Sequence, residues 1–467
     1  MQIPILSGIY TDEMADFNQS YPRNLVPVPV PQGISNGYLK SADGIVQGVV
    51  TTLGVCRGAI NWNGILYAVV GTTLIRISDA WIITNIGTIA GTGYVRFDYS
   101  FDYLSISGGG NLYLYNGVSL TQVTDPDLGT VVDNIWVDGY FMTTDGEYLV
   151  VTELADPFAV DPLKYGSSEI DPDPIVALLK LNNEPHAINR YTIEVFDNIG
   201  GTGFPFSRID GAVISKGAVG TRACCLFDGA IALVGGGRNE KVSIWICGGG
   251  KSARIATRGI DKIIGQYTDS VLSSILMETR SSNGHDLLYI HLPDKTLVFD
   301  ANASQLLGQP VWFMLDSGTK IESKYKANHF IWCYDKWICS DPVSDQIGYL
   351  DDSIASHWGS DVGWEINTGI IYNESRGALI HELELVALTG RTAIGANSTI
   401  SAKYSLDGET WSTPRYIDAG LTGERQKRLV WLGQGPIKNW RIQKFGGDSL
   451  SKLAFARLEV RIEPLME

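Results

Sequence analysis

Three features of this sequence carry residue types that could do chemistry: a glycine-rich turn, six scattered histidines and several acidic stretches. Gly248–Ser252 reads Gly-Gly-Gly-Lys-Ser, and a phosphate-binding loop also ends in Gly-Lys-Ser. That loop needs its first glycine where Trp245 stands, and it must open a helix, whereas Ala253–Ile255 continues as an extended segment. The pattern therefore favours a turn between two strands over a nucleotide site.

The histidines and acidic residues lack the spacing of a metal site. No two histidines stand three or four positions apart on a helix, and His285 and His291, near one predicted hairpin, have no visible third ligand. Neither the stretch from Asp156 to Asp173 nor Asp351-Asp352 matches a calcium loop, which needs ligands at alternate positions and a distal glutamate. We expect structural histidines and solvated acidic loops, with no catalytic, cofactor-binding or metal-binding residues.

One motif resembles a known turn. Ser405–Trp411 is similar to the aspartate-box turn of sialidase-like propellers, but it is one residue shorter between Asp407 and Gly408. We expect Asp407 to cap a β-turn and Trp411 to pack beneath it. No Gly-x-Ser-x-Gly elbow is present. A paired-carboxylate glycosidase stays open, because its two acids can be far apart in the chain.

The composition favours an all-β protein with several domains. The chain has 467 residues, of which 52 are Gly, and it is rich in Tyr, Phe and Trp. With 44% hydrophobic and 19% charged residues it is globular, and it is long enough for two or three domains. Its formal charge of −15 disfavours a protein that grips nucleic acid by charge, but it allows one that lines a passage for DNA. The six cysteines form no Cys-x-x-Cys pair, which favours buried thiols. No signal peptide or membrane span is expected.

A loose repeat predicts a β-propeller of six or seven blades over residues 46–355. Each copy has an apolar strand, a tight turn, a second strand, a polar or Gly turn and a third short strand, as in Ala59–Ile77. Repeats of about 40 to 50 residues are typical of propeller blades, which close into a ring because each needs its neighbour to cover it. Markers of the seven copies, spaced 37 to 56 residues apart, are Gly64, Asp102, Gly139, Arg190, Gly229, His285 and Lys336.

Two segments inside the repeat depart from it. Ile260–Met277 has a helical period, which Gly265 and the cap signal Thr268-Asp269 divide into two pieces. Ala155–Ile175 contains too many prolines for a strand and is expected to be a surface loop between blades.

The two ends differ from the repeat region. Residues 1–45 are expected to form an extended arm, because the alternating prolines of Val26–Pro31 exclude a helix, and the arm could lie along its own domain or along a neighbouring subunit. Residues 362–467 show longer alternating runs, such as Ala378–Leu388 and Leu453–Ile462, which predict a β-sandwich. Basic residues concentrate in this last part and suggest an acidic partner or subunit, although an ordinary mixed surface also fits.

Short matches along nearly the whole chain resemble one family. They include Tyr21–Pro27 and Gly37–Leu39 near the start, Ile255–Thr257 and Ile260–Ile264 in the middle, and Arg428–Trp431 near the end. The series resembles the packaged-DNA stabilisation proteins, or tail hubs, of short-tailed phages of the lambdoid type. None of the matches is a catalytic signature.

The resemblance implies a structural virion protein rather than an enzyme. It implies a homo-oligomeric ring of six copies below the portal and its head-to-tail adaptor, with tail needle, fibre or tailspike proteins as further partners. Such a ring would extend the DNA channel, retain packaged DNA and permit its ejection, without sequence-specific DNA binding. A glycan-binding or glycan-cleaving propeller on a phage tail is the alternative. A generic cellular propeller scaffold fits less well, because the matches reach both ends of the chain.

Overall fold

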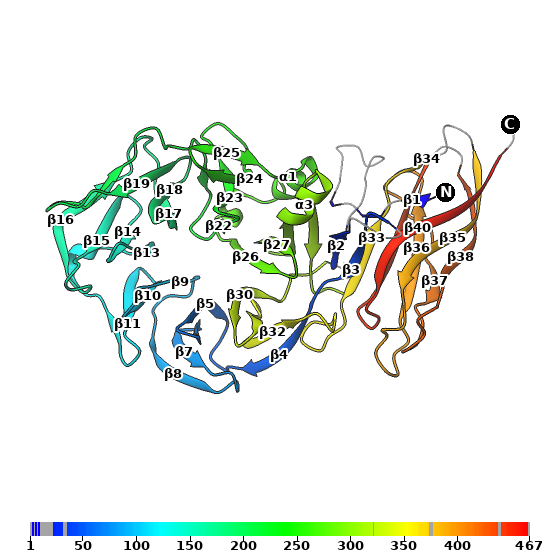
Figure 1. Cartoon of the computed structure of the whole chain (residues 1–467), viewed down its shortest axis with the longest axis horizontal. Helices are drawn as coiled ribbons and strands as arrows, with labels where there is room; N and C mark the ends of the chain where they lie inside the picture. Colours follow the sequence, from blue (N-terminus) through cyan, green and yellow to red (C-terminus); the bar gives the residue numbers. More distant parts are fainter. Residues whose placement is uncertain are drawn as a thin grey trace.

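Short antiparallel strands joined by tight turns make up most of the structure. The computed structural model describes residues 2–3, 5–6, 8–9, 22–30, 35–320, 322–372, 377–437 and 440–465. Figure 1 shows a ring of sheets on one side and two packed sheets on the other, with the chain's N-terminus beside the second unit.

In the part of the chain that the structure describes, seven antiparallel sheets form the ring, so the repeat region is a seven-bladed β-propeller (Figure 1). The first three blades are β5 (Cys56–Trp62), β6 (Ile65–Val70), β7 (Thr73–Ile77), β8 (Ile83–Thr88); β9 (Arg96–Tyr99), β10 (Leu104–Gly108), β11 (Asn111–Tyr115), β12 (Leu120–Gln122); and β13 (Asp133–Val137), β14 (Tyr140–Thr144), β15 (Tyr148–Thr152), β16 (Val160–Ser167).

The next three are β17 (Ile175–Leu181), β18 (Glu184–Asn189), β19 (Ile193–Asn198), β20 (Phe206–Arg208); β21 (Gly217–Ala218), β22 (Cys224–Phe227), β23 (Ala230–Gly236), β24 (Ser243–Gly248), β25 (Lys251–Arg254); and β26 (Leu276–Ser282), β27 (His285–His291), β28 (Thr296–Asp300), β29 (Val311–Leu315). The seventh is β30 (Asn328–Cys333), β31 (Lys336–Ser340), β32 (Gln346–Asp351) and β4 (Gly44–Val50).

The seventh blade closes the ring with strands from both ends of the propeller. β4 pairs antiparallel with β32, from Gly44 opposite Asp351 to Val50 opposite Gln346. Among the described residues, a buried apolar cluster fills each of the seven boundaries between neighbouring blades, including the boundary between the seventh and the first. Each blade therefore covers the apolar faces of both neighbours, as propeller geometry requires.

The short helices lie where the chain departs from the repeat. α1 (Arg258–Ile264) and α2 (Asp269–Leu272) follow the N-caps Thr257 and Thr268, so the predicted break into two pieces is confirmed. A third helix, α3 (Ala301–Leu307), begins after Asp300, and a 3₁₀ turn, η2 (Pro126–Leu128), follows the second blade.

The second unit is a β-sandwich, as predicted. One sheet has the order β2-β3-β40-β35-β38 with β1 beside β40, and the other has the order β33-β39-β36-β37 with β34 beside β39. Trp364 packs against Phe455 and Trp431 against Phe445 between them. The strands are β1 (Gln2–Ile3), β2 (Leu25–Pro29), β3 (Gly37–Ser41), β33 (Gly363–Asn367), β34 (Ile371–Tyr372), β35 (Ala378–Leu388), β36 (Thr399–Ser405), β37 (Arg415–Asp418), β38 (Leu429–Ile437), β39 (Trp440–Asp448) and β40 (Ala454–Pro464).

The segment before residue 46 is more than an extended arm. Its described parts provide β1, β2 and β3, which belong to the sandwich sheet, and β4, which belongs to the propeller. β1 and β3 both pair with β40, more than 400 residues later in the chain. Residues 10–21 and 31–34 of this segment lie outside the described residues. The domain limits set from the sequence, 1–45, 46–355 and 362–467, stay a prediction.

The prediction of a surface loop over Ala155–Ile175 is wrong for the middle of this segment. β16 (Val160–Ser167) lies within it and forms the edge of the third blade beside β15. An edge strand tolerates proline because one row of its N–H groups has no partner in the sheet, so Pro162 does not exclude it. Leu163 and Tyr165 are exposed on this strand, which is why its composition did not indicate a buried strand.

The cysteines are free and mostly buried in the blades. Five are buried and Cys225 is half-buried, which confirms the prediction of buried thiols. Burial raises the pKa of the Cys56 thiol to about 11 and that of Cys224 to about 12, so these thiols stay protonated at neutral pH. Within the described residues, none of the helices has the length and apolar character needed to cross a membrane.

Ring closure generates the first testable prediction. Ile45 on β4 is fully buried between the sixth and seventh blades, whereas Val50 on the same strand is 41% exposed. We expect Ile45→Ala to lower the free energy of unfolding by about 2–5 kcal/mol, since it leaves a cavity at the closing strand. The control Val50→Ala should change it by less than about 0.5 kcal/mol. Guanidinium unfolding followed by tryptophan fluorescence measures both, and equal losses would contradict the prediction.

Candidate functional site

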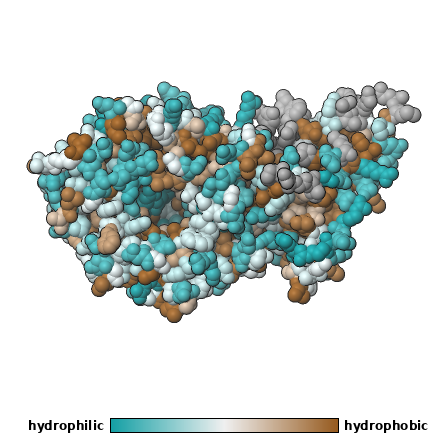
Figure 2. Space-filling view, in the orientation of Figure 1, coloured by the Kyte–Doolittle hydropathy of each residue, from teal (hydrophilic) through white to brown (hydrophobic). Residues whose placement is uncertain are grey.

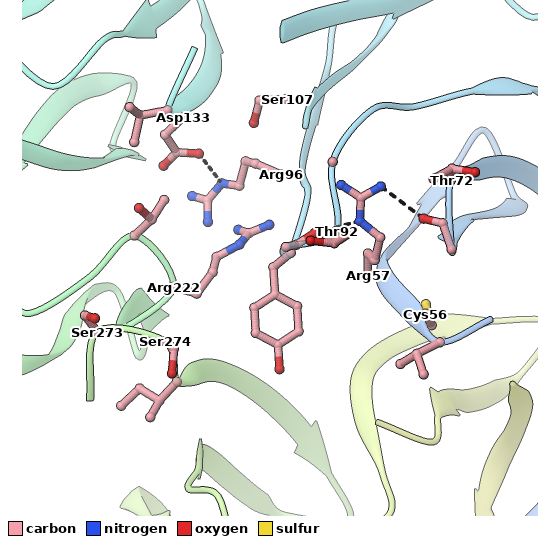
Figure 3. A pocket seen from close by; sticks show the side chains of 18 residues that line it. Cys56, Arg57, Thr72, Thr92, Arg96, Ser107, Asp133, Arg222, Ser273 and Ser274 are labelled. Carbon is pink, nitrogen blue, oxygen red and sulfur yellow. Dashed lines mark hydrogen bonds and ion pairs between the residues drawn. The ribbon is translucent and has the colours of Figure 1, made fainter. Parts of the chain in front are cut away.

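A cavity of about 610 Å³, here called the axial cavity, lies where the inner strands of the blades of this one propeller converge. Figure 2 shows a hollow in this face of the propeller. Its lining comes from the segments that lead into the first strands of the blades, including residues 91–96, 132–133, 221–222 and 273–275. Three arginines, Arg57, Arg96 and Arg222, carry the positive charge of this lining, and of its described residues only Asp133 has a carboxylate (Figure 3).

Arg57 is engaged by backbone carbonyl groups. Its guanidinium donates to the carbonyl oxygens of Gly93 at 2.6 Å, Ala90 at 2.8 Å and Gly71 at 3.0 Å. Burial lowers its pKa. These bonds tie the start of the first blade to the loop that leads into the second, so Arg57 has a structural role.

Arg96 and Asp133 connect three consecutive blades. Arg96 Nε lies 3.8 Å from Asp133 Oδ1, and Arg96 Nη2 donates to the carbonyl oxygen of Leu178 at 3.1 Å. Asp133 also accepts from the backbone N–H of Leu178 at 2.9 Å and of Asn134 at 3.1 Å. The carboxylate is fully buried and its bonding capacity is largely used by these partners.

The glycine-rich turn flagged in the sequence is not part of this cavity. Gly248 pairs with Lys251 across the hairpin of β24 and β25, and Gly249 and Gly250 at its tip have φ of 56° and 73°. Both are left-handed conformations that glycine adopts without strain. The predicted strand-to-strand turn is confirmed.

The histidines have structural partners. His285 Nδ1 lies 2.5 Å from Asp300 Oδ2, and His291 Nε2 lies 2.7 Å from Glu278 Oε1. His357 Nδ1 lies 2.8 Å from Ser317 Oγ. Among the described residues, no group of three or more His, Cys, Asp or Glu is placed to hold a metal ion.

Asp407 caps a turn, as predicted. Its carboxylate accepts from the backbone N–H groups of Glu409 at 3.0 Å and Thr410 at 2.7 Å, and also from the Thr410 hydroxyl. These hydrogen bonds lower its pKa. Trp411 is half-buried next to the turn, with Lys444 Nζ 4.8 Å from its ring centroid.

A second buried cluster joins the propeller to the sandwich. The backbone of Arg23 and Asn24 runs between the two units: Asn24 N donates to Met314 O of β29 at 2.8 Å, and Arg23 N donates to Glu365 O of β33 at 2.9 Å. β2, which follows, contacts both β29 and β33. Arg23 and Asn24 therefore lie between the two domains rather than on their outside.

The side chains at this joint form a buried ion pair. The Arg23 guanidinium is bound to the Asp316 carboxylate through two nitrogens, with Nη2 2.9 Å from Oδ1, and it also donates to Gly318 O at 2.9 Å. Asp316 is fully buried and Arg23 is 6% exposed. Burial raises the pKa of Asp316, and Arg23 opposes this rise. Sequence analysis missed this pair, because its members stand 293 positions apart.

Sequence analysis also missed the arginines of the cavity. A signal was present: Arg96 begins β9, Arg57 is the second residue of β5, and Arg222 stands two residues before β22. Aligning the repeats by their first strands would have placed a basic residue within two positions of the strand start in three blades.

Two family models divide the chain in the way the fold does. The model described as Bacteriophage P22 Gp10, beta-propeller, matches residues 1–355, and the model described as Bacteriophage P22 Gp10, beta-sandwich, matches residues 363–463. The chain belongs to the bacteriophage P22 Gp10 family. This family confirms the resemblance to phage tail hubs, and it identifies a structural protein of the virion tail.

A curated member of the Gp10 family matches the chain over its whole length. The tail hub protein gp10 of Salmonella phage P22 is 26% identical over 484 residues, covering 99% of each chain. The match thus includes both the propeller and the sandwich.

Solved structures of other propellers are only distantly similar. The Neurospora crassa Pan2 WD40 domain has a TM-score of 0.42 and 10% identity, covering 66% of this chain and 95% of its own. The N-terminal domain of Nup159 also has a TM-score of 0.42 and 10% identity, covering 71% of this chain and 99% of its own. Neither likeness bears on function.

The interdomain ion pair of this Gp10 family member generates the second prediction. Arg23→Ala leaves the buried Asp316 carboxylate without its cation, so we expect a loss of about 3–5 kcal/mol in the free energy of unfolding. Arg428 forms exposed ion pairs with Glu382 and Glu384 at the sandwich surface, and Arg428→Ala should lower the stability far less than Arg23→Ala does. Denaturant unfolding compares the two. A loss below 1 kcal/mol for Arg23→Ala would show that the joint does not depend on the pair.

Buried His357 should make the stability of the protein depend on pH. Burial lowers its pKa to about 3 from an ordinary value of 6.5. Below about pH 6.5 the unfolded chain binds a proton that the folded protein excludes, so stability falls as the pH drops towards 3. At pH 5 this effect amounts to about 2 kcal/mol.

We expect His357→Gln to reduce the stability difference between pH 7.5 and pH 5 by about that 2 kcal/mol. The same substitution at the exposed His381 serves as the control for replacing a histidine with glutamine. Urea unfolding at the two pH values is the measurement. An unchanged pH dependence in His357→Gln would rule out His357 as its source.

Proposed function

We propose that the protein forms a ring of six copies in a short phage tail, below the portal and the head-to-tail adaptor. The ring extends the DNA channel, retains packaged DNA and permits its ejection. The observation that carries this proposal is the full-length match to a tail hub protein, which includes both domains. Tail needle, fibre or tailspike proteins are the further partners.

The charge of the chain supports a passage for DNA rather than a grip on it. The formal charge of −15 opposes adhesion of phosphate groups to the channel wall. DNA would then slide past the ring without sequence-specific contacts.

The role that we propose is structural rather than catalytic. A glycosidase needs two carboxyl groups on either side of the bond it cleaves. The described lining of the axial cavity contains one, Asp133, and it is already bound to Arg96 and two backbone N–H groups. This arrangement disfavours the alternative of a glycan-cleaving propeller.

Exposed apolar residues form two separate patches, each of which could contact a neighbouring copy. Phe101 is 93% exposed and Val118 is 89% exposed, on neighbouring turns of the second blade. Ile394 is 93% exposed and Leu421 is 56% exposed, on two sandwich loops joined by a 2.7 Å bond from Thr422 Oγ1 to Thr392 O. A closed ring is built from two unlike surfaces that meet head to tail. We propose that these two patches face neighbouring copies.

Mass photometry of the purified protein, alone and with the adaptor, tests the ring. The expected particle contains six chains of 50.9 kDa, about 305 kDa in all. Phe101→Asp and Ile394→Asp should each reduce the fraction of rings without lowering the melting temperature, while Leu465→Asp, at an exposed position outside both patches, should not. A strict monomer under both conditions, or measurable polysaccharide cleavage, would overturn the proposal.

A further inference from the structure

Arg222 places an uncompensated positive charge inside the axial cavity. It lies in the turn between β21 and β22, and its backbone carbonyl accepts from Met277 N at 2.8 Å, so the turn is anchored to the sixth blade. Its side chain extends into the cavity towards Arg96 (Figure 3). Among the residues that the structure describes, none forms an ion pair or hydrogen bond with its guanidinium.

The nearby acidic groups are already engaged. Asp133 pairs with Arg96 and accepts two backbone N–H groups. Glu278 is bound to His291 at 2.7 Å and accepts from the backbone N–H groups of His329 and Phe330. No carboxylate of the described lining is left to neutralise Arg222.

The second guanidinium leaves the cavity with a net positive charge. Burial and the charge of Arg96 lower the pKa of Arg222 to about 10, which leaves it protonated at neutral pH. Two half-buried guanidinium groups beside the single carboxylate of Asp133 repel one another unless a further negative charge joins them. The molecule therefore holds a preformed, electropositive pocket within an otherwise acidic chain.

We propose that the axial cavity binds a small anion that carries phosphate groups, held between Arg222 and Arg96. The planar donors of arginine match phosphate oxygens in pairs. A volume of about 610 Å³ exceeds what a single phosphate fills and falls in the range of small-molecule sites, so the ligand class includes polyphosphates as well as free phosphate. The hydroxyl groups of Thr92, Ser107 and Thr221 also line the cavity, whereas those of Ser273 and Ser274 donate to the carbonyl oxygens of Ser270 and Val271.

This site belongs to a single propeller and goes beyond the proposed tail role. All of its lining comes from one chain, so binding does not require a ring. An anion there would connect the second, third and fifth blades, because Arg96 begins β9, Asp133 begins β13 and Arg222 lies just before β22. Binding would stabilise the closed propeller by mass action.

Thermal unfolding and calorimetric titration with inorganic phosphate and with pyrophosphate, in a chloride buffer of constant ionic strength, test the proposal. We expect a saturable rise of the melting temperature in the wild-type protein. Arg222→Gln should weaken binding at least about tenfold, because it removes charged hydrogen bonds. Arg238, whose ion pair with Asp171 lies on the propeller surface, provides the control, and Arg238→Gln should bind as the wild type does.

The melting temperatures of the two proteins in phosphate-free buffer show whether Arg222→Gln weakens binding or destabilises the fold. Arg222→Gln should be at least as stable as the wild type in phosphate-free buffer, because it removes a half-buried charge that has no ion-pair partner among the described residues. An equal response of both proteins to phosphate, or no saturable response in the wild type, overturns the proposal. An experimental structure with pyrophosphate should show density between Arg96 and Arg222, and density elsewhere in the cavity alone would overturn their assignment as its ligands.

Discussion

The pairing of β4 with β32 is the contact on which the rest of the molecule depends. A propeller is stable only when its last blade covers its first, and here a strand from before the first blade completes the seventh. The chain must therefore enter the propeller at β4, beside β32, the strand from which it later leaves. This brings residues 22–30 and 35–43 next to the start of the sandwich, where they add β2 and β3 to its sheet.

In this topology the polypeptide chain passes between the two domains more than once. The N-terminal segment pairs with β40 at one end and with β32 at the other, and Arg23 and Asn24 fill the joint between them. Buried polar groups at the joint are satisfied by groups from both domains, so separating the domains would leave Asp316 and Arg23 unpaired. The N-terminal segment therefore holds the propeller and the sandwich together through contacts with both.

Ring closure also explains why charge gathers at the axis. Each blade begins with its inner strand, so residues at the start of successive repeats converge on one cavity (Figure 3). Arg57 reaches the backbone carbonyl groups of its neighbours and Arg96 reaches Asp133, whereas Arg222 faces the open space. Residues far apart in the chain thus form one electropositive pocket in an acidic protein.

Local patterns were sufficient to predict the repeated strands, the sandwich, the division of the helical insert and the turn at Gly249-Gly250. Alternation, capping and turn chemistry depend on neighbouring residues, and the sequence shows them directly. The closing strand β4, the strands β1 to β3 in the sandwich, the Arg23–Asp316 pair and the cavity around Arg222 emerged only with the tertiary structure. Their partners stand up to several hundred residues away, and hydrogen bonding between distant strands leaves no periodic mark on either one. The edge strand β16 was hidden for a related reason, since a strand that buries little apolar surface carries little of the pattern by which strands are recognised.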